Sequence, residues 1–424
     1  MTIVTPVKPA KLRELSEMLC EIGNAPEDNS YIPFRSFKRL HFASLVLDKG
    51  RARPECNPCL IFENNFDGPL ETYLDELCER ALPGLRSIYT HCEGFPSTEV
   101  ISKGEMVSYL RARVVWPLAY HVGNTGRTVQ RILDEQKLRD TMETQTDELV
   151  KNSNTQSANE LRNSLQEFVR KQFPSMCSPV EPRQTSLEKA APWIKIGLLG
   201  LLALVLVLIW WPWGNACFVL VVAYAVILRW KESKDTQLSV PVDAAKLKLL
   251  VENEDRTHSV QNHLANIAIM KPGWIRHITI VGVLWAINLL ARAVYTQGKL
   301  GGIPSIHFAH WSLIDNGKRL LFLSNFDGSW ESYLDDFIDK AHSGLTAVWS
   351  NTVDFPRTRF LVFGGATDGP RFKAFARDNQ VVTNAWYSAY RDLTVQGINK
   401  NSNIRERLFK SLDERATRAW LQQL

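Results

Sequence analysis

The stretch "FLSNFDGSWESYLDDFIDK" (322–340) decides the fold, because a close variant, "IFENNFDGPLETYLDELCE" (61–79), stands far upstream. At one constant offset, Asp67 and Gly68 fall on Asp327 and Gly328. Further identities follow in the same order: 41–43 with 307–309, and 128–130 with 394–396. A self-similarity of this length indicates that one folding unit occurs twice in the chain.

Each copy has the pattern of strand, turn, strand and helix. In the second copy, 306–314 is rich in aromatic and β-branched residues, "DNGKR" is a hairpin turn, and "LLFLSNF" returns as a strand. A helix follows Gly328, with Glu331 in its first turn, where the helix dipole favours an acid. Further strands are predicted at 359–366 and 381–390, with helices at 369–379 and 393–412.

Four strands with helices on one face predict an α+β unit of the ferredoxin-like kind. Two such units related by a pseudo-two-fold axis can close into one α/β barrel, which leaves no exposed sheet edge. We therefore predict two ferredoxin-like repeats that form a pseudo-two-fold barrel and are interrupted by a transmembrane helical hairpin.

Composition narrows the class of protein. With 424 residues, 22% charged and 45% apolar, the chain is long enough for two domains or one large duplicated domain. A net charge of +5, with no Lys/Arg run among aromatic residues, predicts no nucleic-acid partner. The seven cysteines suggest free thiols in a reducing compartment, and the N-terminus lacks the apolar core of a cleaved signal peptide.

A long apolar block, "IKIGLLGLLALVLVLIWWPWGNACFVLVVAYAVILRW" (194–230), separates the copies. Pro212 and Asn215, residue types that favour turns, divide the block into two apolar halves. Basic residues occur only at its outer ends. This pattern predicts a transmembrane helical hairpin with both ends cytoplasmic. The alternatives are a buried core hairpin and a single long span; the span would place Pro212 and Asn215 at the bilayer centre and separate the copies.

The remaining segments complete the predicted organisation. Polar residues interrupt 274–295, which favours an amphipathic helix on the membrane or against the domain over a third span. Segment 128–173 is predicted as a surface helix or helix pair, and 242–270 as helical. The predicted divisions are an N-terminal helix (1–30), repeat 1 (31–140), a helical segment with a Pro-containing linker (141–192), the transmembrane hairpin (193–230), a helical connector with the amphipathic helix (231–300) and repeat 2 (301–424).

Two pairs of residues recur at equivalent positions and are candidate site residues. Asp67 and Asp327, at the strand-to-helix turns, are candidate general acids or bases, although an Asp before Gly at a helix start is commonly a cap. His41 and His307, at equivalent strand starts, are candidate ligands of a metal or haem; the alternative is a satisfied core histidine.

Other motifs give weaker signals. "CNPC" (56–59) has zinc-knuckle spacing, but no second pair follows, so we predict no metal site. Phosphate-loop, G-x-S-x-G, H-E-x-x-H and dinucleotide motifs are absent from the sequence. The aromatic residues are expected mainly in the core, and enough of them exist to line an apolar pocket: Trp311, Trp330, Tyr333, Trp349, Trp386 and Tyr387.

In the stretches "IHFAHW", "SNFDGSWESYLDDFIDK" and "NAWYSAY…LTVQGI", the chain resembles poorly characterised bacterial membrane-anchored proteins. Their halves look like the dimeric α/β-barrel superfamily, which includes dye-decolourising peroxidases and chlorite dismutase-like haem proteins. Those peroxidases carry a G-x-x-D-G motif whose Asp acts on peroxide; here Asn64 or Ser324 replaces its first glycine. The resemblance implies haem as a cofactor and carries over only Asp67 and Asp327.

The expected function is that of a membrane-anchored α/β-barrel protein, acting as a binding or scaffold module at the cytoplasmic face of a bacterial inner membrane. Its expected partners are the lipid bilayer and a small-molecule ligand. The alternatives are a haem-dependent, peroxidase-like oxidoreductase and a protein that acts on or binds lipid. No motif in the chain assigns a reaction.

Overall fold

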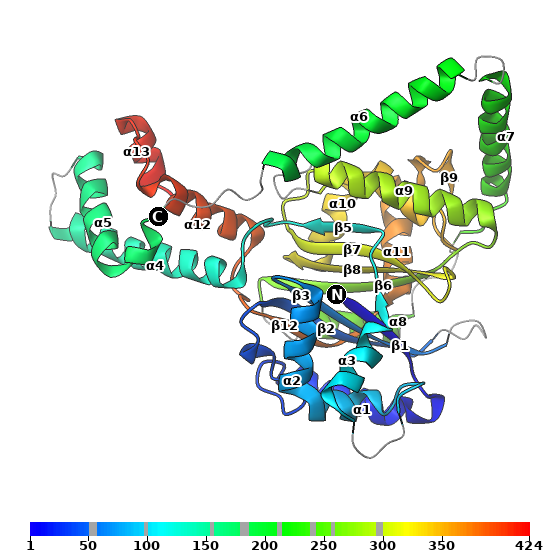
Figure 1. The fold of residues 1–424 in the computed structure, drawn as a ribbon, viewed down its shortest axis with the longest axis horizontal. Coiled ribbons are helices and arrows are strands. Elements are labelled where there is room, and N and C mark those ends of the chain that lie inside the picture. The colour runs from blue at the N-terminus through cyan, green and yellow to red at the C-terminus, as the bar shows by residue number, and fades with distance from the viewer. Residues whose placement is uncertain are drawn as a thin grey trace.

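The structure is a computed structural model that describes residues 1–50, 57–96, 101–152, 157–178, 186–209, 214–237, 243–255, 259–293 and 300–424. Two five-stranded antiparallel sheets stack on each other, with helices on their outer faces (Figure 1). This arrangement agrees with the predicted α+β class.

The first sheet has the order β12-β2-β3-β1-β4, and the second has the order β11-β6-β8-β7-β5. The strands of the first are β1 (Thr2–Pro6), β2 (Leu40–Asp48), β3 (Cys59–Phe66), β4 (Val114–Val115) and β12 (Thr383–Ser388). Those of the second are β5 (Ala119–Val122), β6 (Gln261–Ile269), β7 (Ile306–Ile314), β8 (Arg319–Asp327) and β11 (Gln380–Val381).

Two strands cross between the halves of the chain. Strand β5, from the first half, pairs with β7 in the second sheet, and β12, from the second half, pairs with β2 in the first. Directly after β5, the backbone of Gly123 lies very close to the backbone of Ile306 in β7. This close contact requires a glycine, because a Cβ atom on Gly123 would lie 2.1 Å from the carbonyl oxygen of Ile306. Each sheet is therefore completed by a strand from the other half.

The two central hairpins share their irregularities. The pairing register shifts between Leu40 and Phe42 in one hairpin and between Ile306 and Phe308 in the other. The glycines of both FDG turns have positive φ, +93° at 68 and +86° at 328. The helices that follow, α2 (Leu70–Tyr89) and α10 (Trp330–Trp349), leave helical geometry at 81 and 341.

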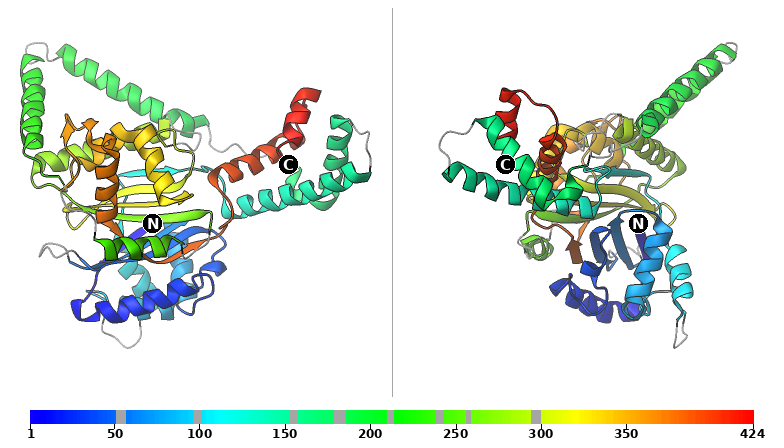
Figure 2. Two further views of the ribbon diagram at one scale, coloured as in Figure 1. Left: turned by 180° about the vertical axis from the view of Figure 1, so that it is seen from behind. Right: turned by 60° about the vertical axis from the view of Figure 1, so that its left-hand side comes forward.

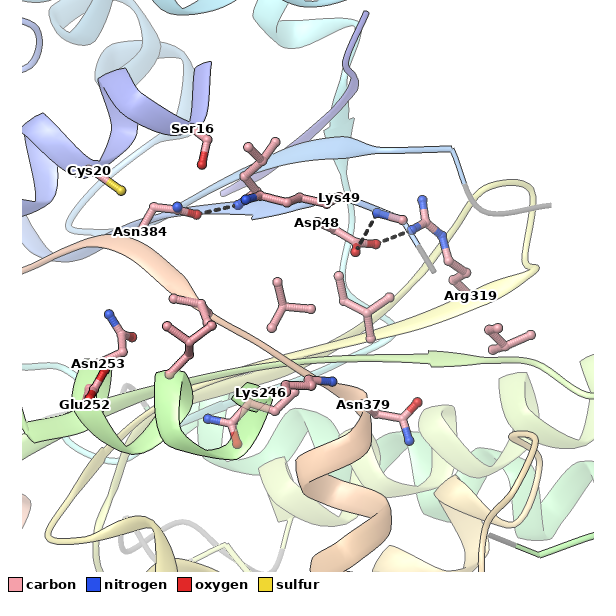
Figure 3. A pocket seen from close by; sticks show the side chains of 18 residues that line it. Ser16, Cys20, Asp48, Lys49, Lys246, Glu252, Asn253, Arg319, Asn379 and Asn384 are labelled. Atoms are coloured by element: carbon pink, nitrogen blue, oxygen red, sulfur yellow. Dashed lines mark hydrogen bonds and ion pairs between the residues drawn. The ribbon is translucent and has the colours of Figure 1, made fainter. Parts of the chain in front are cut away.

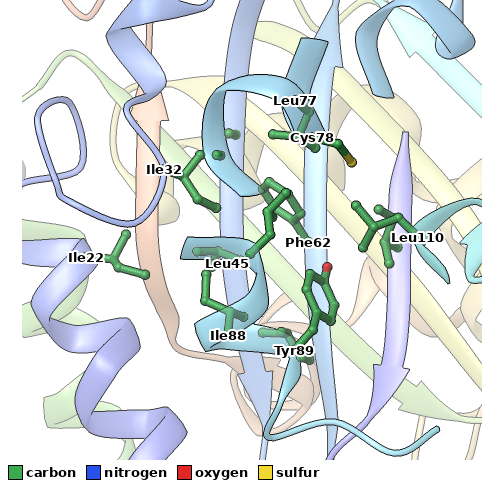
Figure 4. Close-up of a cluster of buried hydrophobic side chains, with 14 of the residues drawn as sticks. Ile22, Ile32, Leu45, Phe62, Leu77, Cys78, Ile88, Tyr89 and Leu110 are labelled. Carbon is green, nitrogen blue, oxygen red and sulfur yellow. The ribbon is translucent and has the colours of Figure 1, made fainter. Parts of the chain in front are cut away.

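Side chains that alternate along the strands build separate cores on the two faces of each sheet. Leu45 and Phe62 are fully buried against α2 and its neighbouring helices α1 (Leu12–Asn24) and α3 (Lys103–Arg111) (Figure 4). Burying a side chain of this size stabilises the fold by about 1.5–3 kcal/mol. On the opposite face, Val46 and Ile61 pack with Leu323 of the other sheet.

A group of four helices, the helical appendage, lies apart from the sheets (Figures 1 and 2). It consists of α4 (Val129–Asn152), α5 (Ala158–Gln172), α12 (Val395–Leu408) and α13 (Glu414–Leu421). Leu165, Ile404 and Trp420 belong to its own apolar core. Segment 128–173 thus forms the predicted helix pair, α4 and α5.

Three apolar helices lie on the side of the second sheet: α6 (Ser186–Ile209), α7 (Gly214–Ser233) and α9 (Trp274–Ala293) (Figure 1). Among the described residues, one helix, 274–292, is long and apolar enough to cross a membrane, and a shorter apolar helix covers 190–201. Of the predicted turn, Pro212 lies outside the described ranges, whereas Gly214 and Asn215 are the first residues of α7. On α9, Ile280 and Leu284 are buried against the domain, whereas Trp285 is 51% exposed.

Three predictions about local structure need correction. The segment 242–270 is not helical throughout, because α8 (Ala244–Asp255) gives way to β6, whose two buried faces leave no alternating pattern in the sequence. The segment 359–366 forms only the short hairpin β9 (Thr358–Arg359) and β10 (Phe363–Gly364). The N-terminal division also begins with a strand, β1, which lies between β3 and β4.

Candidate functional site

The structure brings the predicted aspartates and histidines together as two equivalent pairs. Nε2 of His41 lies 3.0 Å from Oδ1 of Asp67, and Nε2 of His307 lies 2.7 Å from Oδ1 of Asp327. Each histidine is on the first residues of a central strand, and each aspartate follows the neighbouring strand through the FDG turn. From sequence these residues have separate candidate roles, but in the fold each histidine donates a hydrogen bond to its aspartate.

The second carboxylate oxygen of each aspartate stabilises a helix start. The backbone N–H of Val129 donates to Oδ2 of Asp67, and that of Val395 donates to Oδ2 of Asp327, both at 2.8 Å. These amides belong to α4 and α12, the helices that enter the appendage, and not to the helices that follow the FDG turns. A carboxylate that satisfies a free helix amide is a structural cap.

The surroundings of the two histidines do not fit a haem site. Nε2, the usual iron-binding nitrogen, is held by the aspartate in both, and Nδ1 of His41 forms a hydrogen bond of 2.8 Å with the Tyr390 hydroxyl. The His307 ring lies 5.1 Å from the Phe42 ring, centroid to centroid, within packed aromatic side chains. Neither histidine lines any of the three described pockets.

The cysteine motif gives no metal site in the described part of the chain. Cys56 lies outside the described residues, while Cys59, Cys78 and Cys92 are buried free thiols. Burial raises the pKa of each of these three thiols to about 12. No group of three or more His, Cys, Asp or Glu side chains among the described residues is arranged to hold a metal ion.

A buried acid lies at the centre of the space between the sheets. Glu63 is 1% exposed and accepts hydrogen bonds from Ser44 (3.1 Å), Asn65 (2.9 Å) and Nε2 of His263 (3.0 Å). Burial raises its pKa, but the hydrogen bond from His263 and the charges of His263 and His310 outweigh burial and lower the pKa to about 2. Glu63 is thus a carboxylate at neutral pH.

His310, beside this acid, is neutral at neutral pH and becomes charged only in acid, where its charge lowers the pKa of Glu63. Burial lowers its pKa to about 4, against the opposing effect of Glu63, whose Oε1 lies 3.6 Å from its Nδ1. Its other nitrogen, Nε2, hydrogen-bonds the Thr2 hydroxyl at 2.9 Å. The second copy has Leu323 where the first has Glu63, so this acid is not duplicated.

Two further hydrogen bonds join the sheets at equivalent places. The Tyr120 hydroxyl of β5 donates to Oδ1 of Asn65 at 3.2 Å, and Nε1 of Trp386 on β12 donates to Oδ1 of Asn325 at 2.9 Å. Each crossing strand therefore places one aromatic side chain with a polar group against an asparagine of the opposite sheet: Tyr120 against Asn65, and Trp386 against Asn325. These links fix the spacing between the sheets at their polar centre.

A pocket of about 400 Å³, which we call the α9 pocket, lies next to this polar centre. Asn64 and His310 line it from the sheets, Trp116 from the link between β4 and β5, and Asn288 and Arg292 from α9. The pocket thus joins the interior network to the apolar helix on the outside of the domain.

The linings of two other pockets do not favour one class of ligand. One of about 640 Å³ lies where β2 ends, and Arg319 pairs there with Asp48 (Nη1 to Oδ2, 2.5 Å) (Figure 3). Lys246 and Glu252 also line it, so both signs of charge are present. The third, of about 250 Å³, is mainly apolar and lies between α9 and α10.

The sequence reasoning missed Glu63, His263 and His310. The signal for Glu63 was present: it is the only charged residue in the strand "CLIFENNF". His310 lies two residues after Phe308 and therefore on the same face of β7. His263 could not be found, because its strand was predicted as a helix.

Comparison of the chain with protein-family models, with curated proteins and with solved structures finds no significant match.

Proposed function

We propose that this protein is a membrane-anchored binding module, held at a bilayer by α6, α7 and α9, with a ligand site in the α9 pocket. The observation that carries the proposal is the exposure of large apolar side chains on these helices. Leu198 of α6 is 60% exposed, Leu220 of α7 69% and Ile278 of α9 54%. Leaving so much apolar surface in water is unfavourable by about 25 cal/mol per Å², whereas a bilayer would cover it.

The paired sheets would be held firmly to this anchor. Glu232, near the end of α7, is 4% exposed and accepts from the backbone N–H groups of Phe360 and Leu361, both at 2.9 Å. Just beyond it, Asp235 pairs with Lys271 at 2.7 Å and Arg276 at 2.6 Å, at the start of α9. These contacts join the end of α7 to the β9–β10 hairpin and to the start of α9, which directly follows β6 of the second sheet.

We further infer that the two halves are diverged ferredoxin-like copies that close into a pseudo-two-fold barrel. The matching strand orders, hairpin irregularities and His–Asp pairs support this inference. The crossing strands β5 and β12 require both halves in one compartment, which favours a transmembrane hairpin over a single span. The free thiols of Cys59, Cys78 and Cys92 favour the cytoplasmic side of a bacterial inner membrane.

The anchor is tested by washing membranes from expressing cells with alkaline carbonate. We expect the protein to stay in the membrane pellet, and tags on both termini to resist protease added to spheroplasts. Release by carbonate, or digestion of one tag alone, would contradict the proposal.

The haem peroxidase alternative gains no support from the surroundings of His41 and His307. We expect detergent-purified protein, from cells supplied with a haem precursor, to lack a Soret band. A Soret band that disappears in His307→Ala would reverse this assignment.

A further inference from the structure

The α9 pocket contains polar groups that have no partner in the protein. Nδ2 of Asn64 and Oδ1 of Asn288 are buried atoms without a hydrogen-bond partner, whereas Nδ1 of His310 faces the Glu63 carboxylate at 3.6 Å. Asn64 is fully buried and His310 is 3% exposed, and both line the pocket. Buried polar groups are nearly always paired, so two unpaired amide atoms around one cavity indicate a polar ligand or ordered water there.

The charge of the pocket favours an anion. Arg292 is its charged side chain, it is exposed, and no Asp or Glu is among the described residues that line the pocket. Glu63 lies behind His310, but its carboxylate is already occupied by hydrogen bonds from Ser44, Asn65 and His263. A guanidinium matches the geometry of phosphate oxygens and binds them through two parallel hydrogen bonds.

The position of the pocket favours a ligand that comes from the bilayer. Asn288 and Arg292 lie in the last turns of α9, and Leu290, between them, is 46% exposed. Trp116 lines the same pocket and is 71% exposed. Exposed tryptophan and arginine beside an apolar helix are typical of the headgroup level of a membrane.

We propose that the α9 pocket binds the phosphate-bearing headgroup of an anionic phospholipid. Arg292 holds the phosphate, Asn64 donates a further hydrogen bond to it, and the Asn288 carbonyl accepts from a headgroup hydroxyl. The inference rests on the proposed function, because it needs α9 at the bilayer surface.

The test uses the full chain in dodecyl maltoside micelles and isothermal titration calorimetry. The probes are dihexanoyl phosphatidylglycerol, dihexanoyl phosphatidylcholine, glycerol 3-phosphate and inorganic phosphate. We expect phosphatidylglycerol to bind at least about tenfold more tightly than phosphatidylcholine. Both lipids carry the phosphate, but phosphatidylcholine has no headgroup hydroxyl for Asn288 and places a trimethylammonium group near the Arg292 guanidinium. Glycerol 3-phosphate or inorganic phosphate binding as tightly as phosphatidylglycerol would keep the phosphate site but overturn its assignment to lipid.

Variants decide whether Arg292 is the contact. Arg292→Gln should weaken phosphatidylglycerol binding about tenfold, and Arg292→Lys less, because lysine keeps the charge and loses the paired hydrogen bonds. Asn288→Asp should weaken it as well, by charge repulsion. Arg415→Gln, at an exposed position of α13, is the matched control and should bind normally.

Failure of the headgroup proposal is distinguishable from failure of the anchor. Equal affinity for the two lipids, or unchanged affinity in a folded Arg292→Gln variant, would overturn the headgroup site. Carbonate washing of the same variant tests the anchor separately, since α6, α7 and the apolar face of α9 are unchanged in it.

Discussion

The carboxylate of Asp67 accepts a hydrogen bond of 2.8 Å from the backbone N–H of Val129, although 62 residues separate them. The equivalent bond between Asp327 and Val395 spans 68 residues and has the same length. Both aspartates also hold a buried histidine. The repeated turn therefore fixes where the chain leaves each sheet for the helical appendage.

Asp327→Ala should destabilise the protein by about 1–3 kcal/mol, because it removes two hydrogen bonds to a charged acceptor and leaves buried donors unpaired. Asp327→Asn should cost less, since an amide oxygen can still accept. The measurement is the urea midpoint of unfolding in detergent. Asp335→Ala is the control, because its ion pair with Lys373 is largely exposed. Equal midpoints for the two alanine variants would refute the structural role.

Glu63→Gln should remove a pH dependence of stability at acidic pH. The folded-state pKa of Glu63, about 2, is below its ordinary value of 4.5, so its contribution is present above pH 4.5 and is lost as the pH falls toward 2. The full contribution is roughly 3 kcal/mol.

The check is the urea midpoint as a function of pH between 6 and 2. We expect the wild-type curve to fall more steeply than the Glu63→Gln curve below about pH 4.5. Parallel curves would mean that Glu63 does not ionise between the sheets.

Arg162→Met should loosen the helical appendage without affecting the sheets. Nη2 of Arg162 donates to the carbonyl oxygens of Arg407 and Leu408, at 2.8 and 2.9 Å, and so caps the end of α12. Losing these bonds should cost about 1.5–3 kcal/mol locally.

Amide hydrogen exchange is the appropriate measurement for this variant. We expect faster exchange in α12 and α13 and unchanged exchange in β2 and β7. Arg170→Met, which removes a cation–π contact with Phe409 (5.2 Å from guanidinium carbon to ring centroid) on the same helix, should have a smaller effect. Unchanged exchange in Arg162→Met would exclude the cap.

Cysteines on the outer face of α9 should be protected by the bilayer. Ile278→Cys and Trp285→Cys replace exposed apolar residues, whereas Arg415→Cys is a control on the appendage. In inside-out vesicles, an impermeant maleimide should label position 415 several-fold faster than 278 or 285, as quantified by peptide mass spectrometry. Equal labelling would place α9 in water.

Some of the fold could be predicted because its signals are local. The FDG turns, the hairpin "DNGKR" and the helices after them follow from glycine, turn chemistry and periodicity over a few residues. Strand β6 could not be predicted in this way, since both of its faces are buried and its apolar run resembles a helix segment. The two-residue strands β4 and β11 are too short to give any periodic signal.

The residues of the candidate site also fall into those that the sequence identifies and those that only the structure identifies. The sequence singled out Asp67, Asp327, His41 and His307 through their repetition, but not their pairing. Glu63 became significant only when β6 and β7 brought His263 and His310 to it from 200 or more residues away.

By itself, the sequence determined that one strand-turn-helix unit occurs twice and that a long apolar block separates the copies, since these are properties of residue order. Only the tertiary structure decided that β5 and β12 cross between the sheets, that each aspartate caps a distant helix, and that a polar pocket meets α9. The physical reason is that long-range pairing depends on which surfaces pack together, and short stretches of sequence do not encode that directly.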